Sequence, residues 1–302
     1  MIDVKLHTGS ERRLTVRKAV EDLGDDFITK CREAEEIFVH VNLIDSQYQL
    51  ACTHVDAVRG LLDVIRTYSK TPVKIGDAAY RGSKAAFEHF GYERLLDEYH
   101  QVELVDLNED DFVDGETVRE DGSRNPIRRS KVAANAGFKI SLAPLKVHKE
   151  VGMSASVYTW TTGTWIVPSR ISATGRVWAH WPWLEEEGVK AHHESIAELY
   201  RQAPCDVAIV DGIMAMQGDG PVQGSAVEMG VVLAGFDAVA VDAVAATLIG
   251  FDPSEIGYLK ACHESQLGSI DMSQINVPPM QMAELTKQLQ RPFGLDRKLG
   301  EI

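Results

Sequence analysis

The chain is poor in cysteine, with only four among its 302 residues. Cys31, Cys52, Cys205 and Cys262 are far apart and form no Cys-x-x-Cys pair. Their spacing argues against an iron–sulfur cluster and against a paired-cysteine zinc site. So few cysteines do not make a disulfide scaffold, which favours a reducing compartment. We therefore expect a cytoplasmic protein without an iron–sulfur cluster.

The chain also lacks long apolar runs and an excess of basic residues. No stretch of about 18 apolar residues is present to span a membrane, and the N-terminal MIDVKLHTGSERR has no apolar signal core. The 45 acidic and 31 basic residues give a net charge of −14. We therefore expect no membrane partner and no nucleic-acid partner, because nonspecific binding to either anionic surface needs a basic face.

Strand-like apolar runs alternate with helix-like segments. IFVHVNL, VKIGDA, VELVDL and FKISLA are predicted strands at 37–43, 73–78, 102–107 and 138–143, and a helix is predicted over about 54–68. This alternation predicts an α/β fold with a mostly parallel sheet and helices on both faces. The pattern offers no clean linker, so we expect a single domain over 1–302. The polar run VDGETVREDGSRNPIRR at 113–129 is predicted to be an irregular surface excursion.

The segment DGIMAMQGDGPVQG, from Asp211 to Gly224, follows the apolar strand-like run CDVAIV. Its four glycines and one proline predict an irregular loop at the carboxyl end of a strand, where open α/β sheets bind ligands. Asp211 is a candidate catalytic residue, and Gly218, Asp219 and Gly220 are candidate ligand-binding residues. The alternative is a long crossover with solvated aspartates.

Two further segments carry candidate catalytic residues. Asp242 lies in the apolar helix-like run AVAVDAVAATLIG, after Asp237 at the predicted N-cap. A carboxylate is costly to bury there without a partner, so Asp242 is either functional or a structural anchor. Lys146 and His148, in LKVH, share one side of an extended chain and supply a cation and a base. An exposed basic turn is the alternative for this pair.

An early group of polar residues completes the predicted site. Asn42 ends a predicted strand, Thr53 is the expected cap of the following helix, with His54 beside it, and Asp77 closes the next strand. Asn42, Asp77, Lys146 and Asp211 are thus all expected at strand carboxyl ends, which share one edge of a parallel sheet. The sequence predicts that these residues meet in one crevice with the Gly-rich loop.

All five tryptophans lie between 158 and 183. Core packing or a subunit interface is the expected role of this tryptophan-rich segment, and a lid over a flat cofactor is the alternative. The ten histidines include no His-Glu-x-x-His or His-x-His motif, so no preformed zinc site is indicated.

From Ala203 to Gly268 the chain contains CDVAIVDGIMAMQGDGPVQG, VVLAGFDAVAVDAVAATLIGFDP and YLKACHESQLG. In this combination they resemble the domain-of-unknown-function family 362 (DUF362), and LAPLKVH fits the order of the family. Many members carry a ferredoxin-like insertion; this chain lacks those cysteines, so the resemblance implies no cluster here. Gln217 and Pro144 stand where the family tends to have Glu and Lys, which implies a different ligand or an altered activity.

These observations lead to one leading hypothesis and two alternatives. The leading hypothesis is an enzyme that acts on a small anionic metabolite or cofactor, held by Lys146, with Asp211 or Asp242 as the base or as ligand of a divalent cation such as Mg²⁺. The alternatives are a non-catalytic module that binds a cofactor or a redox partner, and an interaction protein that uses its tryptophan-rich surface. A homo-oligomer is left open.

Overall fold

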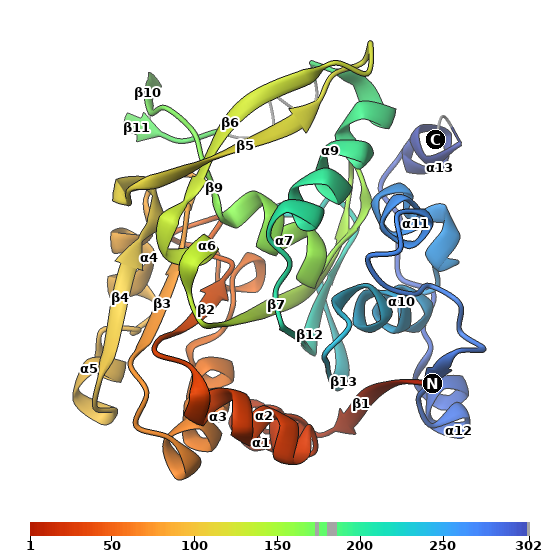
Figure 1. The fold of residues 1–302 in the computed structure, drawn as a ribbon. Helices are drawn as coiled ribbons and strands as arrows, with labels where there is room; N and C mark the ends of the chain where they lie inside the picture. The colour runs from red at the N-terminus through yellow and green to blue at the C-terminus, as the bar shows by residue number, and fades with distance from the viewer. Residues whose placement is uncertain (173–174, 180–185, 301–302) are drawn as a thin grey trace.

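The computed structural model describes residues 1–172, 175–179 and 186–300, and its centre is a large twisted sheet (Figure 1). The strands follow the spatial order β14-β1-β13-β12-β7-β2-β3-β4, with β8 paired to β7. Their bounds are β1 Ile2–Thr8, β2 Ile37–Val41, β3 Val73–Asp77, β4 Val102–Asp106, β7 Phe138–His148, β8 Gly152–Ser154, β12 Val207–Gln217, β13 Ser225–Gly235 and β14 Ile275–Asn276.

Helices cover the sheet on both of its faces, and two small β elements flank it. The helices are α1 Arg12–Glu21, α2 Gly24–Glu33, α3 Val55–Tyr68, α4 Ser83–His89, α5 Arg94–Glu98, α6 Lys131–Asn135, α7 Ser156–Gly163, α9 Gly188–Gln202, α10 Ala238–Leu248, α11 Gly257–Glu264, α12 Pro279–Leu285 and α13 Leu295–Leu299. The small sheets contain β5 Phe112–Val118, β6 Arg124–Ser130 and β9 Trp165–Ile166 in one, and β10 Arg170–Ser172 and β11 Gly175–Val177 in the other.

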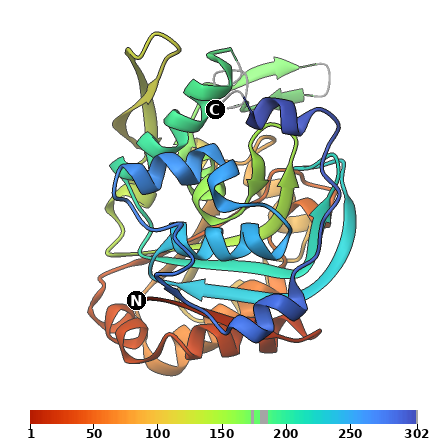
Figure 2. The ribbon, with the colours of Figure 1, turned by 90° about the vertical axis from the view of Figure 1, so that its right-hand side faces the viewer.

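Two apolar cores lie on opposite faces of the sheet, because successive side chains of a strand alternate between them. In β2, Ile37 and Val39 pack in the core under α1 and α3, whereas Phe38 packs in the core under α7 and α10. Figure 2 shows α10 and α11 on one side of the sheet and the N-terminal helices on the other. The predicted α/β fold with helices on both faces is therefore confirmed.

The sheet is mostly parallel, as predicted, and its antiparallel part is centred on β13. The pairs β12·β7, β7·β2, β2·β3 and β3·β4 are parallel, and so is the short β1·β14 pair, but β13 is antiparallel to both β12 and β1. The chain returns from β12 to β13 through a tight connection and not through a crossover helix. The N-terminal strand β1, in which Ile2, Val4 and Leu6 alternate with polar residues, then extends the sheet beyond β13.

Two segments that were expected to be irregular form regular strands, one of them over only part of its length. The excursion expected over 113–129 is an antiparallel hairpin, β5 and β6, which packs on α9. The Gly-rich segment is irregular only over 218–224, since β12 continues to Gln217. Gly212 permits this continuation: a Cβ there would lie 2.9 Å from Val231 Cγ2, and the pairing with β13 is bulged at this point.

The tryptophan-rich segment belongs to the core where the structure describes it. Trp160 in α7 and Trp165 in β9 are buried, and the Trp160 indole N–H donates to the Ala203 carbonyl at 2.7 Å. Trp178 is partly buried against the same core. Trp181 and Trp183 lie outside the described residues. The expectation of core packing is thus confirmed for Trp160 and Trp165.

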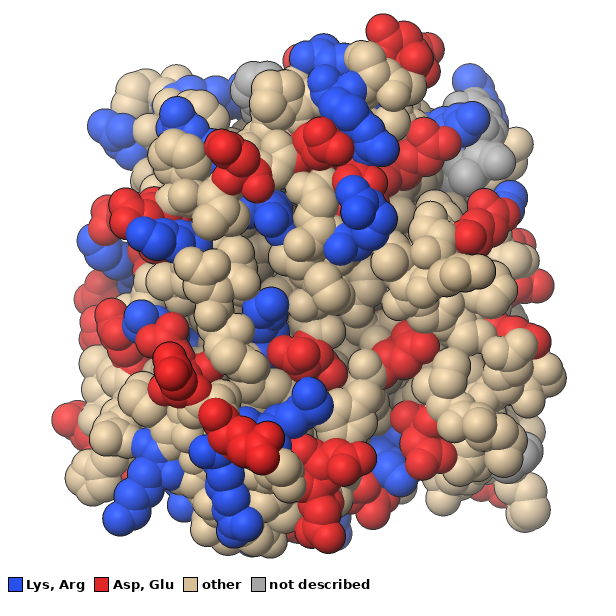
Figure 3. Space-filling view, viewed as in Figure 1, with Lys and Arg blue, Asp and Glu red and all other residues tan. Residues whose placement is uncertain are grey.

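Acidic and basic side chains are interspersed over the face seen in Figure 3. The acidic excess of the sequence therefore does not gather into one patch on this face. Among the described residues, every helix is too short or too polar to cross a membrane.

Candidate functional site

A crevice of about 420 Å³, here called the main crevice, opens at the carboxyl edge of the parallel strands. Its polar lining comes from segments far apart in the sequence. Asn42 and Asp77 come from the ends of β2 and β3, His148 from the end of β7, Tyr158 from α7, His192 from α9 and Asp219 from the β12–β13 connection. The convergence of such groups at this edge is typical of ligand sites in open α/β sheets.

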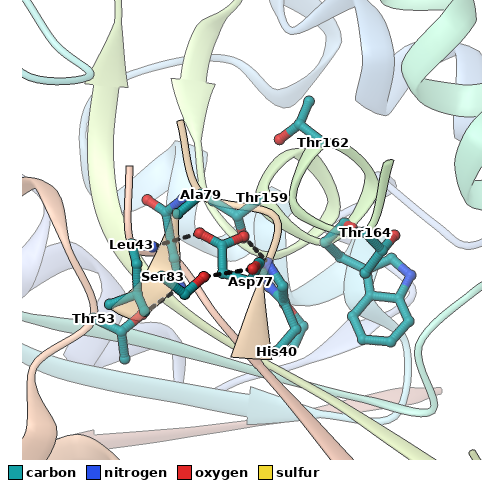
Figure 4. Close-up of polar contacts among 12 residues, drawn as sticks. His40, Leu43, Thr53, Asp77, Ala79, Ser83, Thr159, Thr162 and Thr164 are labelled. Carbon is teal, nitrogen blue, oxygen red and sulfur yellow. Dashed lines mark hydrogen bonds and ion pairs between the residues drawn. The ribbon is translucent and has the colours of Figure 1, made fainter. Parts of the chain in front are cut away.

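Asp77 forms a buried pair with His40 beneath the main crevice (Figure 4). The His40 Nε2–H donates to Asp77 Oδ1 at 3.0 Å, and the Leu43 N–H donates to Asp77 Oδ2 at 2.7 Å. A Cβ on Gly163 would lie 2.0 Å from His40 Nε2, so only glycine lets the end of α7 pack on this pair. Both oxygens of the Asp77 carboxylate are thus already occupied by protein donors.

His148 and His192 form an aromatic wall of the main crevice together with Tyr158. The Tyr158 ring centroid lies 4.9 Å from that of His148 and 6.1 Å from that of His192. Burial lowers the pKa of His148 well below its ordinary value, with the nearby His192 acting in the same direction. Burial likewise lowers the pKa of His192 to about 4. Both imidazoles are therefore neutral at physiological pH.

Hydrogen bonds fix the tautomer of His148. Its Nδ1 accepts the Glu150 N–H at 3.1 Å, so the ring hydrogen of the neutral imidazole is on Nε2. His148 is therefore a hydrogen-bond donor through Nε2.

Lys146 lies within β7, not at the expected strand end, because β7 continues to His148 and pairs with β8. Its ammonium is buried and donates to Asn42 Oδ1 at 2.6 Å and to the Ala51 carbonyl at 2.8 Å. Lys146 thus reaches the main crevice through Asn42, which lines it.

Thr53 has a structural position and does not cap α3. Its hydroxyl accepts the Asn42 N–H and donates to the Leu142 carbonyl, each at 2.9 Å. The N-cap is His54, whose Nδ1 accepts the Asp56 N–H at 3.1 Å. The expectation that Thr53 is the cap is wrong, because its hydroxyl ties the end of β2 to β7.

Gly218 and Gly220 shape the β12–β13 connection. Gly218 has a φ of +74°, and its N–H donates to the Gln290 carbonyl. A Cβ on Gly220 would lie 1.9 Å from the Val147 carbonyl oxygen, so this glycine lets the connection approach β7 closely. Both glycines thereby hold the connection against the main crevice, and the exposed Asp219 between them lines it.

Asp211 and His54 line a second, smaller cavity of about 220 Å³, here called the Arg12 cavity, together with Arg12, Cys52 and Pro144. Asp211 lies within β12, and its Oδ2 is 2.7 Å from Arg12 Nε of α1. Burial raises the pKa of Asp211, and the Arg12 guanidinium opposes this rise. The structure therefore divides the predicted site between two cavities.

Asp242 is completely buried in α10 and lines neither cavity. Its Oδ1 and Oδ2 accept the N–H groups of Ser156 and Val157, each at 2.9 Å, at the start of α7. Burial raises the pKa of Asp242 to about 7, against the lowering by these two hydrogen bonds. These contacts match the structural alternative for Asp242, an anchor between α10 and α7. Asp237 caps α10, as expected, through Ala240 N–H at 2.9 Å.

His192 and Tyr158 line the main crevice, although neither was predicted to be a site residue. His192 lies in the second turn of α9, and neither an apolar pattern nor a motif distinguishes it from a surface histidine. Among the described residues, no group of three or more His, Cys, Asp or Glu side chains is arranged to hold a metal ion. A cation at this site would therefore need oxygen ligands from a bound molecule.

The model of the domain of unknown function DUF362 matches residues 37–247. The chain belongs to the DUF362 family. The family assignment expected from the motifs between Ala203 and Gly268 is thereby confirmed, and the match also includes Asn42, Asp77 and Lys146.

Among relatives, the thylakoid-associated protein sll1697 of Synechocystis sp. is 28% identical to this DUF362 member over 255 residues, which cover 83% of this chain and 71% of the relative. A solved lactate racemase apoprotein from Thermoanaerobacterium thermosaccharolyticum is 17% identical, with a TM-score of 0.49 over 86% of this chain and 56% of that one. A solved Thermotoga maritima protein is 12% identical, with a TM-score of 0.45 over 86% and 60%. This chain thus spans less than two thirds of either solved protein.

Proposed function

We propose that this DUF362 protein is an enzyme that binds a small anionic metabolite or cofactor in the main crevice. The volume of about 420 Å³ lies within the range of small-molecule sites. The location, at the carboxyl ends of β2, β3 and β7, is the usual place for ligands in this class of fold.

The observation that carries the proposal is a set of hydrogen-bond donors in the lining of the main crevice. These are the Asn42 amide, the Nε2–H of His148 and the Lys149 ammonium. Two carboxylates of the lining are engaged within the protein, since Asp77 accepts from His40 and Leu43 and Glu150 is paired with Lys298. An anionic ligand complements the donors, and the exposed Asp219 is left to contact a cation.

His148 is the proposed electrophilic residue. A neutral imidazole with its hydrogen held on Nε2 polarises a ligand oxygen by donating a hydrogen bond to it, and the proton stays on the ring. The exposed Asp219 carboxylate is the proposed contact for a divalent cation such as Mg²⁺, which prefers oxygen ligands and would be held partly by the bound molecule. The four cysteines are buried and free, and we propose a reducing compartment, the cytoplasm, as the setting.

The test compares wild type with a variant whose crevice is filled. Val222 is half-buried and lines the main crevice, so Val222→Trp is expected to block it. Wild type should be stabilised in a thermal-shift screen of carboxylates and phosphates, and Val222→Trp should lose that stabilisation. Leu96→Trp, at an exposed position of α5, is the matched control. Equal stabilisation of all three proteins would contradict binding in the main crevice.

A second experiment separates the enzyme from a non-catalytic binding module. His148→Phe keeps an aromatic ring against Tyr158 in the wall of the main crevice but lacks the Nε2–H donor. Conversion of the stabilising ligand, followed by mass spectrometry, should be lost in this variant while ligand-dependent stabilisation remains. If wild type binds the ligand and never converts it, the binding module is the correct alternative.

A further inference from the structure

Lys146 presents an unusual electrostatic situation beneath the main crevice. Its side chain is 1% exposed, and its two hydrogen-bond acceptors, Asn42 Oδ1 and the Ala51 carbonyl, are both neutral. Among the described residues, no carboxylate lies within ion-pairing distance of its ammonium. Buried charges are normally paired, since an isolated one is costly.

The ammonium also determines how the Asn42 amide is oriented. An ammonium has only donors, so the amide atom 2.6 Å away must be the carbonyl oxygen and not the nitrogen. The amide nitrogen Nδ2 therefore points away from Lys146. No other residue of the described chain accepts from it, and Asn42 lines the main crevice. Two N–H donors are thus presented to the crevice.

We infer that Lys146 and Asn42 together form the carboxylate-recognition element of the main crevice. Asn42 donates to the ligand carboxylate through Nδ2, and Lys146 is a positioning residue that fixes the amide and supplies the counter-charge. This inference rests on the proposed ligand site and narrows its ligand to a molecule with a carboxylate group.

The electrostatic surroundings support this role. Burial lowers the pKa of Lys146 to about 8, and the Asp77 and Cys52 groups oppose this lowering only in part. Asp77 faces it from β3 and Cys52 from the segment before α3, while His148, in the same strand, is neutral. A bound anion would stabilise the charged ammonium, so binding at pH 8 is expected to be accompanied by proton uptake.

The experiment uses three probes that share a phenyl ring, titrated into the full chain by calorimetry at pH 7. They are benzoate, its neutral planar analogue benzamide, and phenylphosphonate, whose head group is tetrahedral. Wild type should bind benzoate at least about tenfold more tightly than benzamide, the usual effect of a charged hydrogen bond. Phenylphosphonate distinguishes a carboxylate site from a phosphate site. If it binds more tightly than benzoate, the carboxylate assignment is wrong.

Two variants test the pair itself. In Lys146→Met the charge is lost and the amide is free to turn, so the preference for benzoate over benzamide should disappear. In Asn42→Asp, Lys146 retains an oxygen partner and gains an ion pair, so the fold is preserved. The second carboxylate oxygen then faces the crevice, and benzoate affinity should fall by about tenfold or more. Lys139→Met, in the same strand but outside the crevice lining, is the matched control and should bind as wild type.

The outcomes separate this inference from the proposed function. Equal affinity of wild type for benzoate and benzamide would leave a ligand crevice but overturn anion recognition. Undiminished benzoate binding by Asn42→Asp would also overturn it, because a purely structural Lys146–Asn42 contact would survive that change. If none of the three probes binds to wild type, although other metabolites stabilise it, the inference would be overturned and the proposed function would not.

Discussion

Replacing Asp242 by Asn is expected to change the pH dependence of stability. Asp242 is completely buried, and its carboxylate accepts two backbone N–H groups at the start of α7. Its pKa of 3.8 in the unfolded chain rises to about 7 in the folded protein, chiefly through burial. Between these values the folded state keeps a proton that the unfolded state has released. The unfolding free energy therefore decreases as the pH rises.

The rise of the pKa from 3.8 to about 7 corresponds to a loss of about 4 kcal/mol between pH 4 and pH 8. Asn has the shape of the protonated carboxyl group and does not titrate. At pH 5 wild type has already lost about 1–2 kcal/mol, because the unfolded carboxyl group is ionised, and this loss offsets the about 1–2 kcal/mol that the changed hydrogen bond costs the variant, so the two proteins should be about equally stable. At pH 8 wild type contains a desolvated charge that the variant lacks, so the variant should be the more stable protein.

Urea unfolding at pH 5, 6, 7 and 8 measures the unfolding free energy of both proteins. Subtracting one free energy from the other at each pH removes the contribution of groups that titrate in both. A pH-independent difference would refute the reasoning. Benzoate titration supplies the second measurement, since Asp242 lines neither cavity and its replacement should leave affinity unchanged. Lost affinity with unchanged stability would place Asp242 in the functional site instead.

Two further substitutions test buried pairs. Asp77→Ala removes the acceptor of the buried His40 Nε2–H and should reduce the unfolding free energy by about 3 kcal/mol, measured by urea unfolding. Arg12→Met leaves the buried Asp211 carboxylate without its cation and should cost about 3–5 kcal/mol while leaving benzoate binding in the main crevice intact. Arg17→Met, in the same helix but in an exposed pair, should cost less than about 0.5 kcal/mol; an equal loss in both variants would contradict the role of burial.

Three of the parallel strands could be predicted from the sequence because each is a short apolar run. β2, β3 and β4 lie within a residue or two of the predicted runs. The antiparallel part was predicted less well, because β12 begins within the strand-like run CDVAIV but continues to Gln217, through residues that indicated a loop. Pairing across the sheet, which the bulge at Gly212 permits, outweighs the local preference for a turn.

The difference between short and long strands also explains which site residues lie at strand ends, as predicted. Asn42 and Asp77 do lie at strand ends, and both line the main crevice. Lys146 and Asp211 lie inside longer strands, so their side chains are directed by strand register and meet partners from distant segments. His192 lies in α9, which is far in the sequence from β2 and β3, and the packing of α9 against α7 brings it to the main crevice.

Lys146, Asp211 and Asp242 show what the sequence can and cannot reveal about a buried charge. Apolar neighbours indicate burial for each, but its role depends on a partner that is distant in the chain. Asp242 accepts from two backbone N–H groups and Asp211 is paired with Arg12, so each has its partner within the protein. Lys146 has neutral acceptors, and one of them lines the main crevice. An anion that binds beside such a charge is stabilised electrostatically. Lys146 differs in this respect from Asp211 and Asp242, and this difference is the physical reason to place the ligand carboxylate at Asn42.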